Sequence, residues 1–123
     1  MNYTEITLRD IAIARSGDKG SDSNIGVIAY NQAGYTFLRE QLTADKVQEF
    51  LKPLNPFHTT RYDLPNLWAF NFVIEGVLDG GGSSSLRIDA QGKTLGQALL
   101  EIPLLVPVHL FPSCIYKPSS ERT

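Results

Sequence analysis

Two glycine-rich stretches carry the residues best suited to bind an anion. The first, ARSGDKGSDSNIG at residues 14–26, sets Arg15 and Lys19 among glycine, serine, aspartate and asparagine residues. The second, DGGGSSSLR at residues 79–87, ends in Arg87. Backbone N–H groups in such loops, together with basic side chains, bind phosphate and carboxylate groups. The pattern indicates an anion site, with Asp18 as a weak candidate for an acid or a base.

A purely structural role accounts for the first stretch equally well. Gly17 and Gly20 can supply backbone conformations with positive φ. Asp18, Asp22 and Asn24 can form local side-chain turns. Both interpretations stay open on the sequence.

The formal motif matches in the chain fail. GDKGSDS lacks the spacing of a phosphate-binding P-loop. An EF-hand loop starting at Asp18 would need ligands where Gly20 and Ala29 stand. Two histidines and one cysteine fall short of a structural zinc site, so we expect neither a metal ion nor a cofactor. Cys114 could act as a nucleophile with His109 as its base, but their proline-rich surroundings favour a surface or interface role.

Length and composition favour one ordinary globular domain. The chain has 123 residues, of which 42% are hydrophobic and 20% charged, with a net charge of −2. Neither nucleic acid nor a membrane is expected as a partner, because basic residues are not concentrated and no apolar run reaches membrane-spanning length. A lone cysteine fits a reducing compartment, so we expect a soluble, cytoplasmic protein.

The first third of the chain predicts a hairpin. Residues 3–14 alternate apolar and polar side chains, which indicates one strand with a bulge near Arg9 and Asp10. Residues 24–30 are a second, β-branched strand. The glycine-rich residues 15–23 between them would form a wide loop.

Helical periodicity follows the hairpin. Residues 31–54 predict two consecutive helices, with Thr43 as the N-cap of the second and Pro53 at its end. Residues 61–65 predict a short strand, and residues 92–102 a further helix. The four prolines of residues 103–118 predict an extended tail that lies along a neighbouring chain.

Residues 66–78 predict the longest strand, and its two faces are both largely apolar. One face carries Trp68, Phe70, Phe72 and Ile74, and the other carries Leu67, Ala69, Asn71 and Val73. One layer of helices covers only one face, so the other is expected to meet a second copy or another chain. Asn71 is more readily explained by structural hydrogen bonds than by a ligand.

Strand directions bear on the anion site. A hairpin followed by a right-handed crossover gives an α+β fold with a mainly antiparallel sheet of about four strands and helices on one face. The same directions place the glycine stretches 15–23 and 79–85 at one end of the sheet. Arg15, Lys19 and Arg87 would then lie close together.

Several segments together resemble a known family. GDKG, LPNL, NFV and GGGSSSLRIDAQGK, within about residues 6–102, resemble the small domain associated with the acyclic terpene utilisation protein AtuA. That resemblance implies a ferredoxin-like α/β sandwich in the separate, short form of a domain that also occurs fused to a larger AtuA domain. It also implies a context, the catabolism of acyclic terpenes and related branched acyl-CoA compounds. Ser21 and Trp68 depart from the family pattern.

The resemblance and the glycine stretches define a candidate ligand-binding set. Its members are Arg15, Gly17, Asp18, Lys19, Gly20, Asn24, Asn71, Gly81, Gly82, Ser85 and Arg87. We expect a domain over residues 1–102 and a proline-rich extension over residues 103–123.

Two functions follow from these patterns. The first is an accessory or assembly subunit that associates with itself, with a larger AtuA-type protein, or with both. The second is a small protein that binds acyl-CoA or another anionic small molecule, or an enzyme acting on it, through the two glycine stretches.

Overall fold

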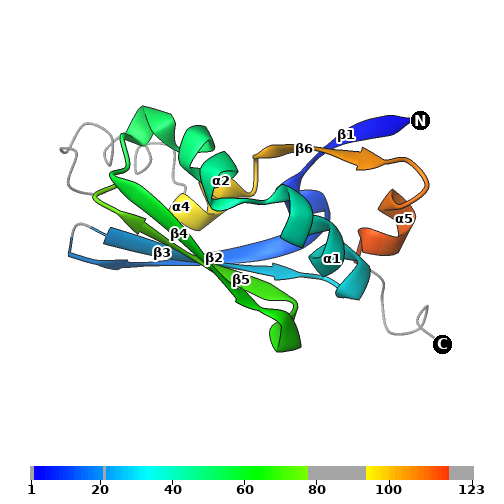
Figure 1. Cartoon of the computed structure of the whole chain (residues 1–123), viewed down its shortest axis with the longest axis horizontal. Helices are drawn as coiled ribbons and strands as arrows, with labels where there is room; N and C mark the ends of the chain where they lie inside the picture. Colours follow the sequence, from blue (N-terminus) through cyan, green and yellow to red (C-terminus); the bar gives the residue numbers. More distant parts are fainter. Residues whose placement is uncertain (1, 21, 78–93, 117–123) are drawn as a thin grey trace.

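A four-stranded antiparallel sheet forms the base of the molecule (Figure 1). The computed structural model describes residues 2–20, 22–77 and 94–116. The sheet has the order β2-β3-β5-β4, with every neighbouring pair antiparallel. Its strands are β2 (Ala12–Lys19), β3 (Asp22–Ala29), β4 (His58–Leu64) and β5 (Ala69–Glu75).

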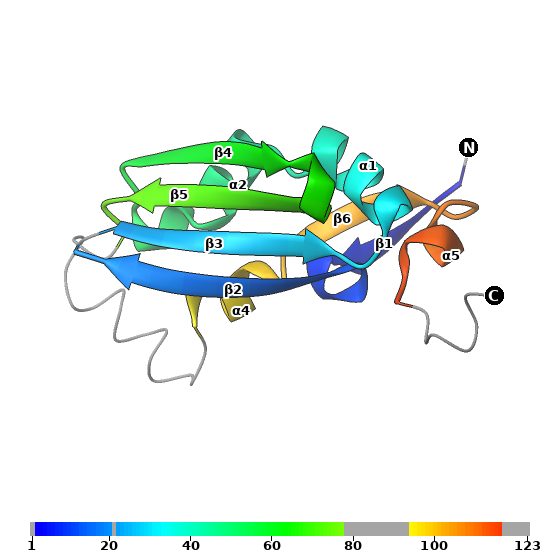
Figure 2. The same ribbon diagram turned by 90° about the horizontal axis from the view of Figure 1, so that it is seen from below.

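The α-helices and a second, two-stranded sheet lie on one side of this sheet (Figures 1 and 2). These elements are the helices α1 (Gln32–Gln41), α2 (Ala44–Phe50), α4 (Leu95–Leu99) and α5 (Phe111–Cys114), and a two-stranded sheet of β1 (Tyr3–Thr7) and β6 (Pro103–Pro107). The predicted α+β class, with a sheet of about four strands and helices on one face, is confirmed.

The connection from β3 to β4 produces a split βαβ unit. The chain leaves β3, passes through α1 and α2, and returns as β4 parallel to β3, with β5 inserted between the two strands. This unit is the centre of the ferredoxin-like arrangement. The edge position beside β3 is occupied by β2, which precedes β3 in the chain.

The predicted single strand over residues 3–14 is wrong. A 3-10 helix at Leu8–Asp10 separates β1 from β2, and the two strands belong to different sheets. The carboxylate of Asp10 accepts a hydrogen bond from the Thr7 N–H at 3.1 Å. Leu8 and Ile11, three residues apart, are both fully buried. A strand would send that pair to opposite faces, so their spacing favours a helical turn.

The predicted wide loop at residues 15–23 is also wrong, because the strands continue through it. β2 reaches Lys19 and β3 begins at Asp22, so only Gly20 and Ser21 separate them. Gly20 has a φ of 63°, as tight two-residue hairpin turns require. Gly17 does not have positive φ. The polar strand residues of this hairpin have the composition of a loop, which explains the error.

The two predicted helices after the hairpin are confirmed. The side chain of Asn31 caps α1 by accepting from the Gly34 N–H at 2.8 Å. Thr43 caps α2 as predicted, accepting from the Lys46 N–H at 3.1 Å. These caps satisfy N–H groups that a helix start leaves without partners.

β5 is shorter than predicted. It has 7 residues, whereas β2 and β3 have 8 each. Pro65–Leu67 instead form a 3-10 turn, and Trp68 follows with a φ of 52°. The proline at the start of this turn lacks the N–H that a sheet ladder needs, so the strand begins only at Ala69.

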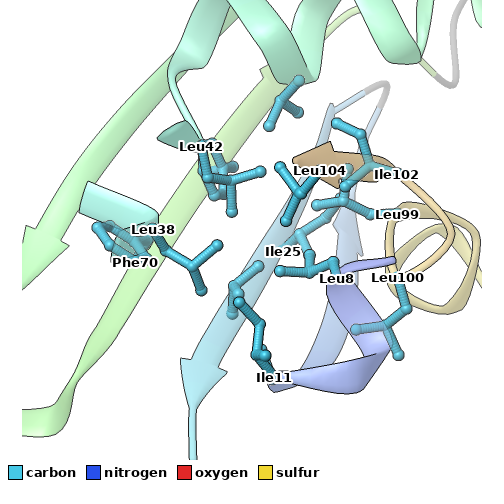
Figure 3. Close-up of a cluster of buried hydrophobic side chains, with 14 of the residues drawn as sticks. Leu8, Ile11, Ile25, Leu38, Leu42, Phe70, Leu99, Leu100, Ile102 and Leu104 are labelled. Carbon is cyan, nitrogen blue, oxygen red and sulfur yellow. The ribbon is translucent and has the colours of Figure 1, made fainter. Parts of the chain in front are cut away.

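The core fills the space between the sheet and its cover (Figure 3). Phe70, Phe72 and Ile74 of β5 are fully buried, as their alternation predicts, whereas Trp68 is exposed. The covering layer adds apolar side chains from α1, α4, the 3-10 helix and β6. In Figure 3 these include Leu38, Leu42, Leu8, Leu99 and Leu104.

Pro103–Pro107 form the extended strand β6 within the domain. They pair with β1 of the same chain, from Thr7 opposite Pro103 to Tyr3 opposite Pro107. After β6, the Asn31 amide donates to the Ile115 carbonyl at 3.2 Å, which holds the chain after α5 against the start of α1. The proposed domain boundary at residue 102 stays a prediction.

Helix α4 approaches β2 closely at Gly96. The Gly96 N–H donates to Ser16 Oγ at 3.1 Å, and a methyl group on Gly96 would lie 3.2 Å from the Arg15 carbonyl carbon and from Ser16 N. We expect Gly96→Ala to lower the free energy of unfolding by about 1 kcal/mol. Overpacking costs roughly 1–3 kcal/mol, and the better helix propensity of alanine offsets part of it.

Urea denaturation measures this effect, with Gly26→Ala as the matched control. A methyl group on Gly26 would meet only the Arg15 carbonyl oxygen, at 3.9 Å. A Gly96→Ala variant as stable as the wild type would show that α4 can move away from β2.

Candidate functional site

No helix or strand among residues 2–20, 22–77 and 94–116 covers the face of the four-stranded sheet opposite the helices. Seen from below, the four strands lie in front of α1 and α2 (Figure 2). Because side chains alternate along a strand, the register aligns outward-facing residues in rows across the sheet. The first row is Ile13, Ile28, Ala69 and Leu64, the second is Arg15, Gly26, Asn71 and Tyr62, and the third is Gly17, Asn24, Val73 and Thr60. We call these three rows the outer face.

Large apolar side chains are exposed on the outer face. Ile13, Ile28 and Leu64 of the first row are exposed, as are Tyr62 of the second row and Leu67 beside the first. Neighbouring strands bring them together, so they form a patch rather than scattered single residues. A patch of this kind is typical of an interaction surface.

A hollow of about 570 Å³ opens on the outer face around Gly26. Its lining includes the side chains of Asn24, Ile28, Tyr62, Leu64, Leu67, Ala69 and Asn71. The Asn24 amide donates to Asn71 Oδ1 at 3.4 Å, and Gly17 leaves room for the Asn24 side chain, which lies 3.1 Å from where a Gly17 methyl would be. The hollow thus has a polar side made by two amides and an apolar side.

No contact with the described residues requires a glycine at position 26. Its φ is not positive, and an added methyl group would contact only Arg15 O at 3.9 Å. A glycine inside a strand costs roughly 0.5–1 kcal/mol relative to alanine. Glycine in a strand often marks a place where a ligand or another backbone approaches closely. Gly26 therefore leaves the backbone of β3 open to close approach from this side of the sheet.

Arg15 lies directly opposite Gly26 in the sheet register. It is exposed, and within residues 2–20, 22–77 and 94–116 the structure gives it no ion pair. Of the predicted ligand-binding set, the fold brings Arg15, Gly17, Asn24 and Asn71 onto one face, and Asn24 and Asn71 line the hollow. The outer face can accept an apolar group on one side and a hydrogen-bonding or anionic group on the other.

Asp18 does not join this group. It lies opposite Ser23, in a row that alternates with the outer rows and therefore faces the helix side. Asp18 is exposed at the tip of β2. Arg15 and Asp18 lie three residues apart on one strand, and this odd spacing puts their side chains on opposite faces. Lys19 pairs with Asp22 in the backbone register, next to the turn at Gly20.

The end of β5 lies beside the hairpin. β2 and β5 end at the same end of the sheet, and Asp22 Oδ1 accepts from the Gly76 N–H at 2.9 Å. Gly76 thus lies next to the β2–β3 turn. The predicted site residues Gly81, Gly82, Ser85 and Arg87 lie outside the described residues.

Gly26, Tyr62 and Leu64 line the hollow but were not in the predicted ligand-binding set. A glycine inside the β-branched run NIGVIA was the available signal for Gly26. Tyr62 and Leu64 could be found only by pairing β4 with β5, since they lie far from residues 14–26 in the sequence.

A second hollow, of about 650 Å³, lies between α1 and the β1–β6 sheet. It is lined mainly by apolar residues, among them Tyr3, Phe37, Leu105 and Leu110. No residue of the predicted ligand-binding set lies there.

Cys114 is a poor candidate nucleophile. Its side chain is fully buried, and its thiol donates to the Leu110 carbonyl at 3.6 Å. Burial raises the pKa of the Cys114 thiol above its usual range, which disfavours the reactive thiolate.

A model of one protein family covers most of the chain. The family is described as the AtuA ferredoxin-like domain, and its model matches residues 6–105. The chain belongs to the AtuA ferredoxin-like domain family. A search of curated proteins and a search of solved structures each found no match. The resemblance noted in the sequence is confirmed, and the whole outer face falls within the AtuA ferredoxin-like domain.

No helix in the described part of this AtuA ferredoxin-like domain is long and apolar enough to cross a membrane.

Proposed function

We propose that the chain is an accessory or assembly subunit that docks its outer face onto a larger AtuA-type protein. In this proposal the assembly takes part in the catabolism of acyclic terpenes or related branched acyl-CoA compounds. Membership of the AtuA ferredoxin-like domain family supports the choice of partner. The observation that carries the proposal is the glycine-floored hollow at Gly26 within an exposed apolar patch.

The patch supplies the driving force for docking. Ile13, Ile28, Leu64 and Leu67 are exposed to solvent in the free chain. Removing apolar surface from water contributes about 25 cal/mol per Å². Gly26 allows the partner to approach the backbone of β3, where a larger residue would hold it away.

Gly26→Val tests the proposal. We expect its free energy of unfolding to stay within about 1 kcal/mol of the wild type, because valine favours strands and its Cβ would lie 3.9 Å from the nearest described atom, the Arg15 carbonyl oxygen. Affinity for the AtuA-type protein should fall at least about tenfold, because the side chain fills the hollow. The chain and the AtuA-type protein of the same organism are co-expressed, measured by native mass spectrometry, and titrated by calorimetry.

Leu105→Ala is the matched control for this experiment. Leu105 is an exposed apolar residue on β6, away from the outer face, so its variant should bind like the wild type. The proposal fails if the wild-type chain forms no stoichiometric complex. It also fails if folded Gly26→Val binds as tightly as the wild type.

A second candidate function is the binding of acyl-CoA or another small anion. The observation that favours it is the position of Arg15, Asn24 and Asn71 on one face, where Asn24 and Asn71 line a hollow that also has an apolar side. Asp18 has no part in this version, because it faces the other side of the sheet. The same native spectra discriminate the two functions: a homogeneous small added mass on the chain, removed by Arg15→Ala, would support the second.

A further inference from the structure

We propose that the docking segment of the partner presents an apolar side chain to the hollow at Gly26 and, one strand spacing away, a carboxylate to Arg15. This inference rests on the proposed docking function. It adds the chemistry of the segment that occupies the outer face.

The shape of the hollow selects an apolar group. Ile28, Leu64 and Leu67 line it, and the floor is the backbone at Gly26 and the methyl group of Ala69. Such a surface offers contacts to an aliphatic or aromatic side chain and no charge to pair with one. An inserted apolar side chain is the usual anchor in the fully desolvated centre of an interface.

The charge of the outer face selects a carboxylate beside that anchor. Arg15 is the only charged residue in the three rows, and it stands opposite Gly26 on the neighbouring strand. A partner seated on Gly26 necessarily covers the backbone beside Arg15. Covering a guanidinium without a counter-charge is costly, whereas a carboxylate can accept two parallel hydrogen bonds from it.

The outer face of a second copy, stacked row on row, does not supply this carboxylate. The three rows contain no acidic residue, so two outer faces stacked row on row offer Arg15 no counter-charge. The nearest acids on the same strands, Asp22 and Glu75, lie at the end of the sheet beyond the third row. A partner with an acid near its apolar anchor is complementary to the order of residues on the outer face.

Charge variants of Arg15 test the inference with the purified AtuA-type protein as the probe. We expect Arg15→Gln to weaken binding about tenfold and Arg15→Glu about a hundredfold, and both to reduce the salt dependence of the dissociation constant. Arg9→Glu is the matched control. Arg9 is also exposed, on the turn between β1 and β2 and outside the outer face, and its variant should bind within about twofold of the wild type.

Photo-crosslinking locates the segment. p-Benzoylphenylalanine in place of Tyr62, at the rim of the hollow, should form crosslinks to one segment of the partner, whereas the same group in place of Phe57 should not. The crosslinked segment should contain an aspartate or glutamate next to an apolar residue. Replacing that acid with lysine should raise the affinity of the partner for the Arg15→Glu variant at least about tenfold, because the two substitutions re-form the ion pair with the charges exchanged.

Three outcomes would overturn the inference while leaving docking intact. They are unchanged affinity and salt dependence in Arg15→Glu, a crosslinked segment without an acid, and failure of the lysine exchange to rescue binding. Crosslinks between two copies of the chain would overturn it by assigning the outer face to self-association. If the wild-type chain forms no complex at all, the docking function and this inference fall together.

Discussion

Phe70→Ala is expected to lower the free energy of unfolding by about 3–5 kcal/mol. Phe70 is fully buried on the helix side of β5. Its ring stacks on Tyr35 with centroids 4.8 Å apart, and the Arg61 guanidinium lies 5.0 Å from its centroid. Alanine would remove these contacts and leave a cavity between the sheet and α1, because the close-packed surroundings collapse only partly.

Urea or guanidinium denaturation followed by circular dichroism measures this loss. Domains of this size have about 5–15 kcal/mol of stability in total, so the variant should lose a large fraction of its stability and unfold at a clearly lower denaturant concentration. Phe57→Ala is the control, because Phe57 is 81% exposed and its removal should change stability by no more than about 0.5 kcal/mol. Similar small losses in both variants would contradict the packing described here.

Arg61→Met is expected to cost about 2–4 kcal/mol. Arg61 Nη1 donates to the carbonyl oxygens of Arg39 and Leu42, each at 2.9 Å, at the end of α1. Its Nε lies 2.8 Å from Asp63 Oδ1, and its side chain is only 19% exposed. Methionine keeps most of the stem but leaves two helix carbonyls and a carboxylate without this donor. Leaving such groups unpaired costs more than the pair itself contributes.

Two further variants separate these contributions in the same denaturation measurement. The Arg39–Glu40 ion pair is solvent-exposed, so Arg39→Met should cost less than about 1 kcal/mol. Adding Asp63→Asn to Arg61→Met should recover part of the loss, since the carboxylate no longer needs a counter-charge. A loss in Arg61→Met no larger than in Arg39→Met would show that Arg61 contributes as an ordinary surface residue.

The parts of the fold set by local signals were predictable from the sequence. The role of Thr43 as the N-cap of α2 was predictable because its hydroxyl accepts a hydrogen bond from a backbone N–H only three residues further along the chain. Phe70, Phe72 and Ile74 point to the core because a strand alternates its side chains without exception over that span. Both features depend on neighbours within a few residues.

The parts set by distant pairing were not predictable in the same way. β1 and β6 pair across most of the chain, and neither strand carries a local mark of its partner. Which residues share the candidate site depends on the alternation of side chains along β2. Once residues 15–19 form a strand rather than a loop, Arg15 and Asp18 must separate onto opposite faces. The position of Gly26 in a hollow becomes visible only once β5 and β4 are placed beside β3, because they supply most of the residues that line the hollow.

The pairing of β1 with β6 also sets an order of events during synthesis. All four strands of the large sheet have been made once Glu75 is added, but β1 has no partner until Pro107. At ~5–20 residues per second, the intervening stretch takes about 2–6 s to translate. During that interval β1 and the apolar residues that β6 and α4 will cover lie open on the nascent chain. The pairing of β6 with β1 is therefore a late, long-range folding step. Mutations in β6 should lower the yield of folded protein after translation more than mutations in the β2–β3 hairpin do.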